Sequence, residues 1–365
     1  MTKLILIGGF LGSGKTTLLA EAAKKLAAVG KTVGLITNDQ APDLVDTRLL
    51  SRTGKGVSEV SGSCFCCNFN GFVDAVKCLT DQGVETIIAE PVGSCTDLSA
   101  TIMNPIKKFH PDWQLAPLTV LVDPHRFMEA LGKVPSKADP DALYIMKLQM
   151  DEADRILVNK ADTLSESQQR EIEKLLVENF SGKVTGLISA RTGEGIDDWL
   201  DEIQHGKDAG KTIIDVDYDR YAHGEAVLGW LNASAKVKDR RAPTAGKADV
   251  SAILRSLMAN FQAELHKAGA EVGHVKAILN LDGKECVANL TRLDGDVEIR
   301  EVGSKSDEPV LVFNARAQMS PEALEKIARE LLETTASENL DVTIETLRCL
   351  MPGRPNPTHR FTEVI

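Results

Sequence analysis

The sequence of 365 residues lacks three features that would each define a class of protein. It has no apolar stretch of about 18 residues, the length that a membrane-spanning helix needs. It has no N-terminal secretion signal, because the short apolar run Leu4–Ile7 fits the first strand of a fold. Positive charge is not in excess, since the net charge is −11. We therefore expect a cytoplasmic protein that binds neither nucleic acid nor a membrane.

A disulfide framework is absent as well. The chain has seven cysteines, and three of them, Cys64, Cys66 and Cys67, fall within four residues. In a reducing compartment such a cluster is typical of metal binding or redox chemistry. The remaining composition, 43% hydrophobic and 26% charged, is that of an ordinary globular protein long enough for two domains.

Short apolar runs alternate with helical patterns from Lys3 to about Leu200. This alternation predicts an α/β fold with a mostly parallel sheet covered on both faces. Strands are expected at Leu4–Ile7, Val33–Ile36, Thr86–Ala89, Leu118–Val122, Ile156–Val158 and Thr185–Ile188. We expect this first domain to span residues 1–204, with a linker at 205–219.

The second half of the chain has a different pattern. It predicts a smaller α+β domain of split βαβ type over residues 220–350, followed by an extended, proline-containing tail at 351–365. Strands are expected at Glu225–Asn232 and Asp341–Leu347, and a hairpin around Asp282-Gly283. Long amphipathic helices are expected at Asp249–Ala268 and Pro321–Thr334.

A phosphate-binding loop lies directly after the first predicted strand. Residues 9–16 read GFLGSGKT, which matches G-x-x-x-x-G-K-[ST], and a helical pattern follows. Backbone N–H groups of such a turn and the helix dipole favour a polyanion. Lys15 is expected to neutralise phosphate charge, and the Thr16 hydroxyl to bind Mg²⁺. The residues assigned to nucleotide binding here are Gly12, Ser13, Gly14, Lys15, Thr16 and Thr17.

Two further motifs predict that the base is guanine. Residues 159–162 read NKAD after a strand-like run, and residues 189–191 read SAR after the next one. The Asp162 carboxylate can accept from guanine N1–H and the 2-amino group, whereas adenine offers neither donor there. Both motifs follow strand ends, where open α/β sheets bind ligands. The residues expected at the base are Asn159, Lys160, Asp162, Ser189, Ala190 and Arg191.

The cysteine cluster predicts a second kind of site. Three thiols can face one thiophilic cation, and thiolates select Zn²⁺, Co²⁺, Cu(I) or iron–sulfur chemistry over Mg²⁺. Three ligands leave one tetrahedral position open, which suits a metal that is taken up and passed on but equally a catalytic zinc. Cys95 could approach as a fourth ligand, and a small buried cysteine is the simpler interpretation of that residue.

These motifs in this order resemble the CobW/HypB/UreG group of P-loop GTPases. Besides GFLGSGKT and NKAD, the chain has Cys64-Phe65-Cys66-Cys67, a CxCC signature of the CobW-like branch, and an ExxG segment that begins at Glu90. The resemblance implies a GTP-dependent metallochaperone or metallocofactor maturation factor that uses GTP, Mg²⁺ and Zn²⁺ or Co²⁺. It also implies that Glu90 reaches Mg²⁺, directly or through water, and that the three cysteines bind the transition metal.

The chain departs from the CobW-like pattern after its second strand. The segment Thr37-Asn38-Asp39 is more similar to the hydrogenase and urease maturation GTPases, and Asp39 is placed to contact Mg²⁺ or its water. We count Lys15, Thr16, Asp39 and Glu90 as the catalytic set. None of them is a strong general base, so hydrolysis should be slow without a partner.

The expected function is a GTPase that couples GTP to metal binding and delivery. Its expected partner is a client metalloprotein or a cobalamin-related enzyme, and a homodimer is compatible with the sequence. One alternative is a switch GTPase or protein chaperone for a cobalamin-dependent enzyme, with structural or redox cysteines. A small-molecule kinase is a second alternative, which NKAD and SAR disfavour.

Overall fold

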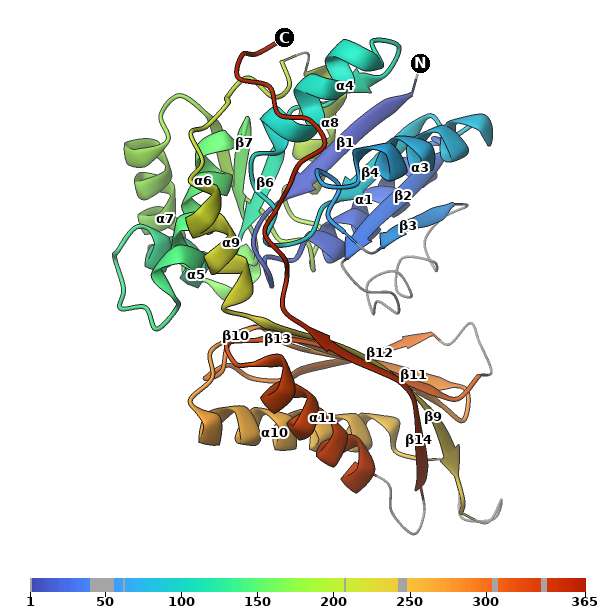
Figure 1. Ribbon diagram of the computed structural model, residues 1–365. Coiled ribbons are helices and arrows are strands. Elements are labelled where there is room, and N and C mark those ends of the chain that lie inside the picture. The colour runs from blue at the N-terminus through green and yellow to red at the C-terminus, as the bar shows by residue number, and fades with distance from the viewer. Residues whose placement is uncertain are drawn as a thin grey trace. The chain divides into compact units, whose positions relative to one another are not determined.

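The alternating apolar runs of the first half form a parallel β-sheet. The structure, a computed structural model, describes residues 2–39, 56–61, 63–206, 208–241, 248–303, 308–335 and 340–365. Its described residues divide into two units, each with its own sheet (Figure 1). One unit holds the chain up to Gly224 together with Arg354–Ile365, and the other holds Glu225–Gly353.

The sheet of the first unit has the strand order β3-β2-β4-β1-β6-β7-β8, and the short β5 also pairs with β1. All of these pairings are parallel. Because β1 is central and fully buried, its residues form the continuous apolar run that the sequence shows. The strands are β1 Lys3–Gly8, β2 Val33–Asp39, β3 Val57–Ser61, β4 Thr86–Glu90, β5 Gln114–Leu115, β6 Thr119–Val122, β7 Arg155–Val158 and β8 Val184–Leu187.

Helices cover both faces of this sheet (Figure 1). On one face, α1 (Lys15–Ala28) and α8 (Ile196–His205) bury Leu18 and Trp199 in a cluster with Ile5 of β1. The other helices are α3 Phe69–Asp81, α4 Asn104–Phe109 after a π-helical turn at Ser99–Met103, α5 Pro124–Ala130, α6 Pro140–Glu152, α7 Glu166–Asn179 and α9 Tyr218–Ala226. Within the described ranges, no helix has the length and apolar character to cross a bilayer.

The parallel arrangement brings the predicted motifs to one edge of the sheet. The phosphate loop follows β1, Glu90 ends β4, NKAD follows β7 and SAR follows β8. Carboxyl ends of parallel strands lie at the same edge, so the expected α/β fold positions these residues together.

The second unit is an antiparallel sheet with α10 and α11 on one face (Figure 1). The strand order is β12-β11-β10-β13-β9-β14. Its core, β9-α10-β10-β13-α11-β14, is the split βαβ arrangement that the sequence predicts, and β11 and β12 extend the sheet. The elements are β9 Gly229–Asp239, α10 Val250–Ala268, β10 Val272–Leu281, β11 Lys284–Leu290, β12 Glu298–Gly303, β13 Val310–Ala317, α11 Pro321–Thr335 and β14 Leu340–Leu350.

Several elements differ from the sequence-based expectation, among them the strands β5 and β12, which were not predicted. The predicted strand Glu225–Asn232 is wrong in its first part, because α9 continues to Ala226 and β9 begins only at Gly229. The run there is apolar at successive positions and has neither a helical nor a strand period. The strand β3 was not predicted, because Val57–Ser61, at the sheet edge, has only two apolar residues, and their spacing of three fits neither a strand alternation nor an apolar run.

Candidate functional site: a nucleotide loop and a cysteine cluster

The phosphate loop has the backbone conformation that its glycines permit. Gly9 and Gly14 have φ of 131° and 96°, which L side chains rarely adopt. A Cβ at Gly9 would lie 2.1 Å from the Leu121 carbonyl oxygen, and one at Gly14 would lie 2.3 Å from Nδ2 of Asn159. A side chain at Gly9 would collide with the backbone of β6, and one at Gly14 with the side chain of Asn159. The loop ends at the N-terminus of α1.

The polar side chains of the loop converge on β4. The Thr16 hydroxyl donates to the Glu90 carboxylate over 3.0 Å. The Lys15 ammonium donates to the Gly9 carbonyl oxygen over 2.7 Å and lies 3.8 Å from the same carboxylate. All three side chains are buried. The Ser13 hydroxyl is buried and has no hydrogen-bond partner among the described residues, so a phosphate oxygen could accept its hydrogen bond.

Asn159 links the phosphate loop to the predicted base site. Its Nδ2 donates to the Ser13 carbonyl oxygen, and its Oδ1 accepts from the Ala190 N–H, each over 2.8 Å. The amide therefore fixes the NKAD and SAR segments against the loop. The Ala190 N–H, a candidate for guanine O6, is engaged by Asn159 in this structure.

The Asp162 carboxylate lies where the motif predicts, beside the SAR segment. It accepts from the Ser189 hydroxyl over 2.6 Å and forms an ion pair with the exposed Arg191. Burial works to raise the pKa of Asp162, but Ser189 and Arg191 outweigh it and hold the pKa below its ordinary value. The group is thus an anionic acceptor, as recognition of a guanine edge requires.

Lys160 has a partner that the sequence did not reveal. Its ammonium lies 2.7 Å from the carboxylate of Asp123. Asp123 directly follows β6 and is the N-cap residue of α5. Burial acts to raise the pKa of Asp123, and the charge of Lys160 more than offsets it. This pair holds Lys160, whose φ is 62°, in its left-handed conformation beside the base site.

Among the residues that the structure describes, no side-chain contact bears on the predicted roles of Thr17 and Asp39. Thr17 is half-buried in the first turn of α1. Asp39 ends β2, where it pairs in register with Ser61 of β3, and its side chain lies outside the described part of the chain.

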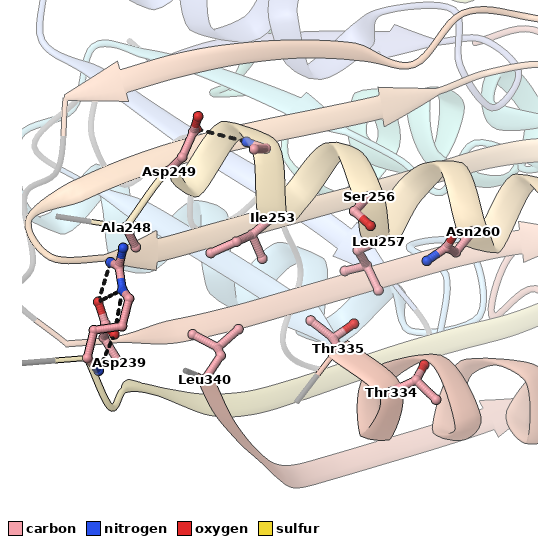
Figure 2. Close-up of a pocket in the computed structure, with 12 residues that line it drawn as sticks. Asp239, Ala248, Asp249, Ile253, Ser256, Leu257, Asn260, Thr334, Thr335 and Leu340 are labelled. Atoms are coloured by element: carbon pink, nitrogen blue, oxygen red, sulfur yellow. Dashed lines mark hydrogen bonds and ion pairs between the residues drawn. The ribbon is translucent and has the colours of Figure 1, made fainter. Parts of the chain in front are cut away.

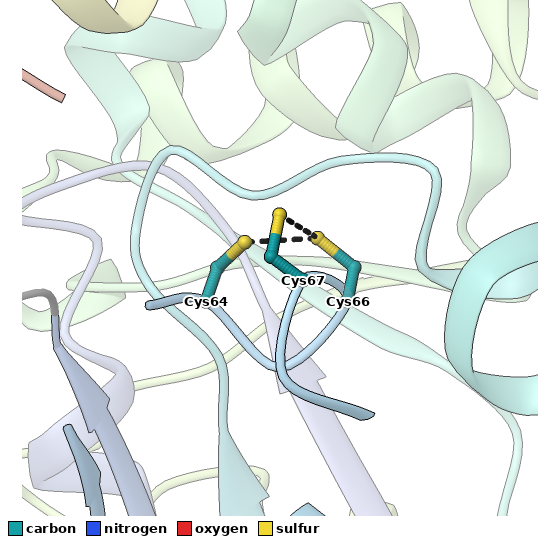
Figure 3. Close-up of side chains that lie close together, drawn as sticks. All are labelled: Cys64, Cys66 and Cys67. Atoms are coloured by element: carbon teal, nitrogen blue, oxygen red, sulfur yellow. Dashed lines mark hydrogen bonds between the residues drawn. The ribbon is translucent and has the colours of Figure 1, made fainter. Parts of the chain in front are cut away.

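The three clustered cysteines point at one another (Figure 3). Cys64 and Cys66 have sulfur atoms 2.9 Å apart, and the sulfur atoms of Cys66 and Cys67 are 3.8 Å apart. All three lie within 4.8 Å of one another. Cys64 and Cys66 are buried, and Cys67 is partly exposed. This set of soft donors fits a thiophilic cation such as Zn²⁺ or Co²⁺.

Hydrogen bonding among the three thiols gives them different pKa values. Contacts from Cys66 and Cys67 lower the pKa of Cys64, so the cluster favours one thiolate. The contact with Cys64 in turn raises the pKa of Cys66, and raises that of Cys67 to about 11. The remaining protons would leave on metal binding.

Asn38 forms hydrogen bonds that hold the cysteine loop, by which we mean residues 63–68. The sequence interpretation missed this role, because it concentrated on Asp39. The Nδ2 of Asn38 donates to the carbonyl oxygens of Val60 and Ser63 over 2.7 and 2.8 Å. Its Oδ1 accepts from the Phe65 N–H over 2.8 Å. The cysteine loop is therefore fixed to the end of β2, the strand that pairs with β4.

The chain terminus forms a strap, Arg354–Ile365, across the first unit (Figure 1). The Asn356 N–H donates to the Cys67 sulfur over 3.2 Å, and the Thr358 N–H donates to the Cys66 carbonyl oxygen over 2.8 Å. Arg360 forms an ion pair with the buried Asp97 over 2.6 Å. The sequence predicted an extended tail but gave no sign that it contacts the cysteine loop.

A separate hollow lies in the second unit. It encloses about 360 Å³ between α10, α11 and the end of β9 (Figure 2). Arg241 and Asp239 form an ion pair on its wall. None of its lining residues belongs to the nucleotide or cysteine motifs, and we assign it no ligand.

Together these features define the first unit as a P-loop nucleotide-binding domain. The model of the CobW/HypB/UreG nucleotide-binding domain matches residues 3–185, half of the chain. The chain therefore belongs to the CobW/HypB/UreG family.

Two curated relatives each match about half of the chain. Zinc-regulated GTPase metalloprotein activator 1 of Dictyostelium discoideum is 25% identical over 201 residues, which cover 47% of this chain and 42% of the relative. Zinc chaperone YeiR of Escherichia coli (strain K12) is 29% identical over 198 residues, which cover 51% of this chain and 57% of the relative. The chain thus spans about half the length of the curated relatives it matches.

Two solved structures are also similar. HypB from Helicobacter pylori in complex with nickel is 18% identical, with 56% of this chain and 87% of that one covered and a TM-score of 0.41. The Zn(II)-bound YjiA GTPase from E. coli is 16% identical, with 92% and 99% covered and a TM-score of 0.36. At sequence identities and TM-scores this low, neither the ligands nor the activities of these two proteins can be assigned to this chain.

Proposed function

We propose that this protein binds and hydrolyses GTP and couples the nucleotide state to the binding and delivery of a transition metal. The observation that supports it most is the sharing of one sheet edge. Glu90, at the end of β4, accepts from Thr16 of the phosphate loop, while Asn38, near the end of the adjacent β2, holds the cysteine loop. A nucleotide and a metal would thus be bound through neighbouring strands.

In this proposal the residues of the nucleotide site position charge. Lys15 exchanges its contact with the Gly9 carbonyl oxygen for phosphate oxygens. Thr16 and Glu90 hold Mg²⁺, which when bound neutralises phosphate charge. Asp162 accepts from the guanine edge, and Asn159 keeps the base site in register with the loop.

The cargo of the site is Zn²⁺ or Co²⁺, bound by the thiolates of Cys64, Cys66 and Cys67. Zinc is favoured by the names of both curated relatives, and Zn²⁺ exceeds Co²⁺ in intrinsic affinity at such sites. The receiving partner is a client metalloprotein. A cobalamin-related client rests on the CobW-like signature alone.

The test is GTP turnover in wild type and Lys15→Ala. Loss of the phosphate-binding ammonium should reduce phosphate release by on the order of 100-fold or more. Lys25→Ala is the matched control, because Lys25 lies on the same helix and only pairs with the exposed Asp197. Full turnover in Lys15→Ala, or ATP turnover as fast as GTP turnover in wild type, would contradict the proposal.

A further inference from the structure

A fourth cysteine lies beside the three of the CxCC segment. Cys95 is in the loop that follows β4 and is 1% exposed. Its thiol interacts with those of Cys64 and Cys66, although it is not one of the three thiols that all lie within 4.8 Å of one another. Four-fold ligation would therefore need this loop to bring Cys95 closer to the cluster. It comes from a different part of the chain than the cysteine loop, which follows β3. Two separate loops therefore bring sulfur atoms to one place.

The backbone around Cys95 is held firmly. Its N–H donates to the Val92 carbonyl oxygen over 2.9 Å, which closes a turn. The side-chain amide of Gln149, on α6, donates to the carbonyl oxygens of Gly93 and Cys95 over 3.1 and 2.8 Å. The thiol is therefore positioned by main-chain and amide contacts, as the ligands of a metal site usually are.

The contacts of Cys95 distinguish it from the other cysteines outside the cluster. Cys286 is buried in the apolar core of the second unit. Cys78 is exposed on α3, where its sulfur atom accepts from Gln82. Cys95 instead lies against two thiols that already face each other. Four thiolates are a common and complete ligand set for tetrahedral zinc.

We propose that Cys95 is the fourth sulfur ligand of a four-thiolate metal site formed with Cys64, Cys66 and Cys67. This inference rests on the proposed metal binding at the cysteine loop. It changes the chemistry of the site, because the fourth position is filled by the protein and not by water. Release of the metal then requires exchange of a ligand, and Cys67, the partly exposed one, is the most accessible to a partner.

The inference also gives the nucleotide a direct connection to the metal. Glu90 and Cys95 belong to the same short segment, with Glu90 on the Thr16 hydroxyl and Cys95 on the cysteine cluster. A shift of Glu90 when Mg²⁺ binds would move the segment that bears the fourth ligand. The loops after β3 and β4 would then respond together.

The test is X-ray absorption on the full-length protein loaded with one equivalent of Zn²⁺. Wild type should show four sulfur atoms at about 2.3 Å. Cys95→Ser should show three sulfur atoms and one lighter ligand at about 2.0 Å, and should bind Zn²⁺ on the order of 10- to 100-fold more weakly. Cys78→Ser, which alters an exposed thiol, should match wild type.

The wild-type spectrum is informative even if Cys95→Ser fails to fold. Three sulfur atoms with one lighter ligand in wild type would overturn the four-thiolate site and leave the proposed function intact. Zinc that stays bound with unchanged affinity in Cys64→Ser/Cys66→Ser would place the metal elsewhere, which would overturn the proposed function and this inference with it.

Discussion

At the scale of single residues, the proposed recognition of guanine depends on one carboxylate. Asp162 is kept anionic by Ser189 and Arg191. Asp162→Asn replaces an acceptor by an amide, which can donate to the 2-oxo group of xanthine but clashes electrostatically with the guanine 2-amino group. We expect GTP affinity to fall by about 10-fold or more and xanthosine triphosphate to become the better ligand.

Equilibrium binding of GTP and xanthosine triphosphate to wild type and to Asp162→Asn measures this change of nucleotide preference. Glu171→Gln, an exposed change on α7, is the control for altered net charge. An unchanged preference for GTP in Asp162→Asn would show that the base is read by other groups.

A second residue makes stability depend on pH. Glu152 is fully buried near Asp97, and burial followed by that neighbouring charge raises its pKa from 4.5 to about 8. The folded protein therefore keeps a proton that the unfolded chain releases between these values. Stability is full below this window and falls as pH rises through it, by at most about 1.4 kcal/mol per pH unit.

Glu152→Gln removes the ionisation and should remove this pH dependence. The stability of Glu152→Gln relative to wild type should therefore increase as the pH is raised from about 5 to about 8. Urea unfolding at several pH values measures the difference, again with Glu171→Gln as control. Parallel pH profiles for wild type and Glu152→Gln would show that the carboxyl is ionised in the folded protein throughout.

At the scale of elements, the strap Arg354–Ile365 is held by one buried ion pair and one exposed pair. Arg360 pairs with Asp97, whose side chain is 1% exposed, whereas Arg354 pairs with Asp219, which is 85% exposed. Arg360→Met leaves the Asp97 carboxylate buried without its cation. It should cost about 1–3 kcal/mol of stability, and Arg354→Met less than about 0.5 kcal/mol.

Loss of the Arg360 pair should also release the strap from the cysteine loop. Limited proteolysis should then remove the terminus of Arg360→Met faster than that of Arg354→Met. Equal proteolysis rates and equal unfolding energies in the two variants would show that the other contacts of the strap hold it without the ion pair. These include the contacts of Asn356 and Thr358 with the cysteine loop and those of Phe361 and Ile365 with Ala100 and Asn104.

The elements show what a sequence can and cannot predict. The strand β1, the phosphate loop and α1 are encoded locally, by an apolar run, glycines and a helical pattern, and they form as expected. The strap has no period of its own, and its place is set by residues distant in the chain, such as Asp97 and Cys67. Local patterns carry no information about such contacts.

The same limit applies to the site. The motifs single out Lys15, Thr16 and Asp162 because their expected chemistry is tied to fixed spacing, and their roles stay predictions. Asn38 was overlooked, because an asparagine near a strand end is usually a capping or turn residue. Its role depends on the position of the cysteine loop, which only the folded chain reveals.

At the scale of the whole molecule, the account makes metal affinity a function of the nucleotide state. In the proposed function, nucleotide contacts would reach the cysteines through two paired strands, β4, which ends at Glu90, and β2, which carries Asn38. Allosteric couplings of this kind are typically about 1–3 kcal/mol. By linkage, the factor by which the nucleotide changes metal affinity equals the factor by which the metal changes the preference for GTP over GDP.

The most direct measurement is a competition titration of Zn²⁺ into the full-length protein. It is made with a non-hydrolysable GTP analogue, with GDP and without nucleotide, and Cys66→Ser/Cys67→Ser serves as the control that lacks the site. We predict affinities that differ by roughly 5- to 150-fold between the GTP-analogue and GDP states, and no nucleotide dependence in the control. Equal affinities in all three states of the wild type would contradict the account and favour a switch GTPase whose cysteines have a structural role.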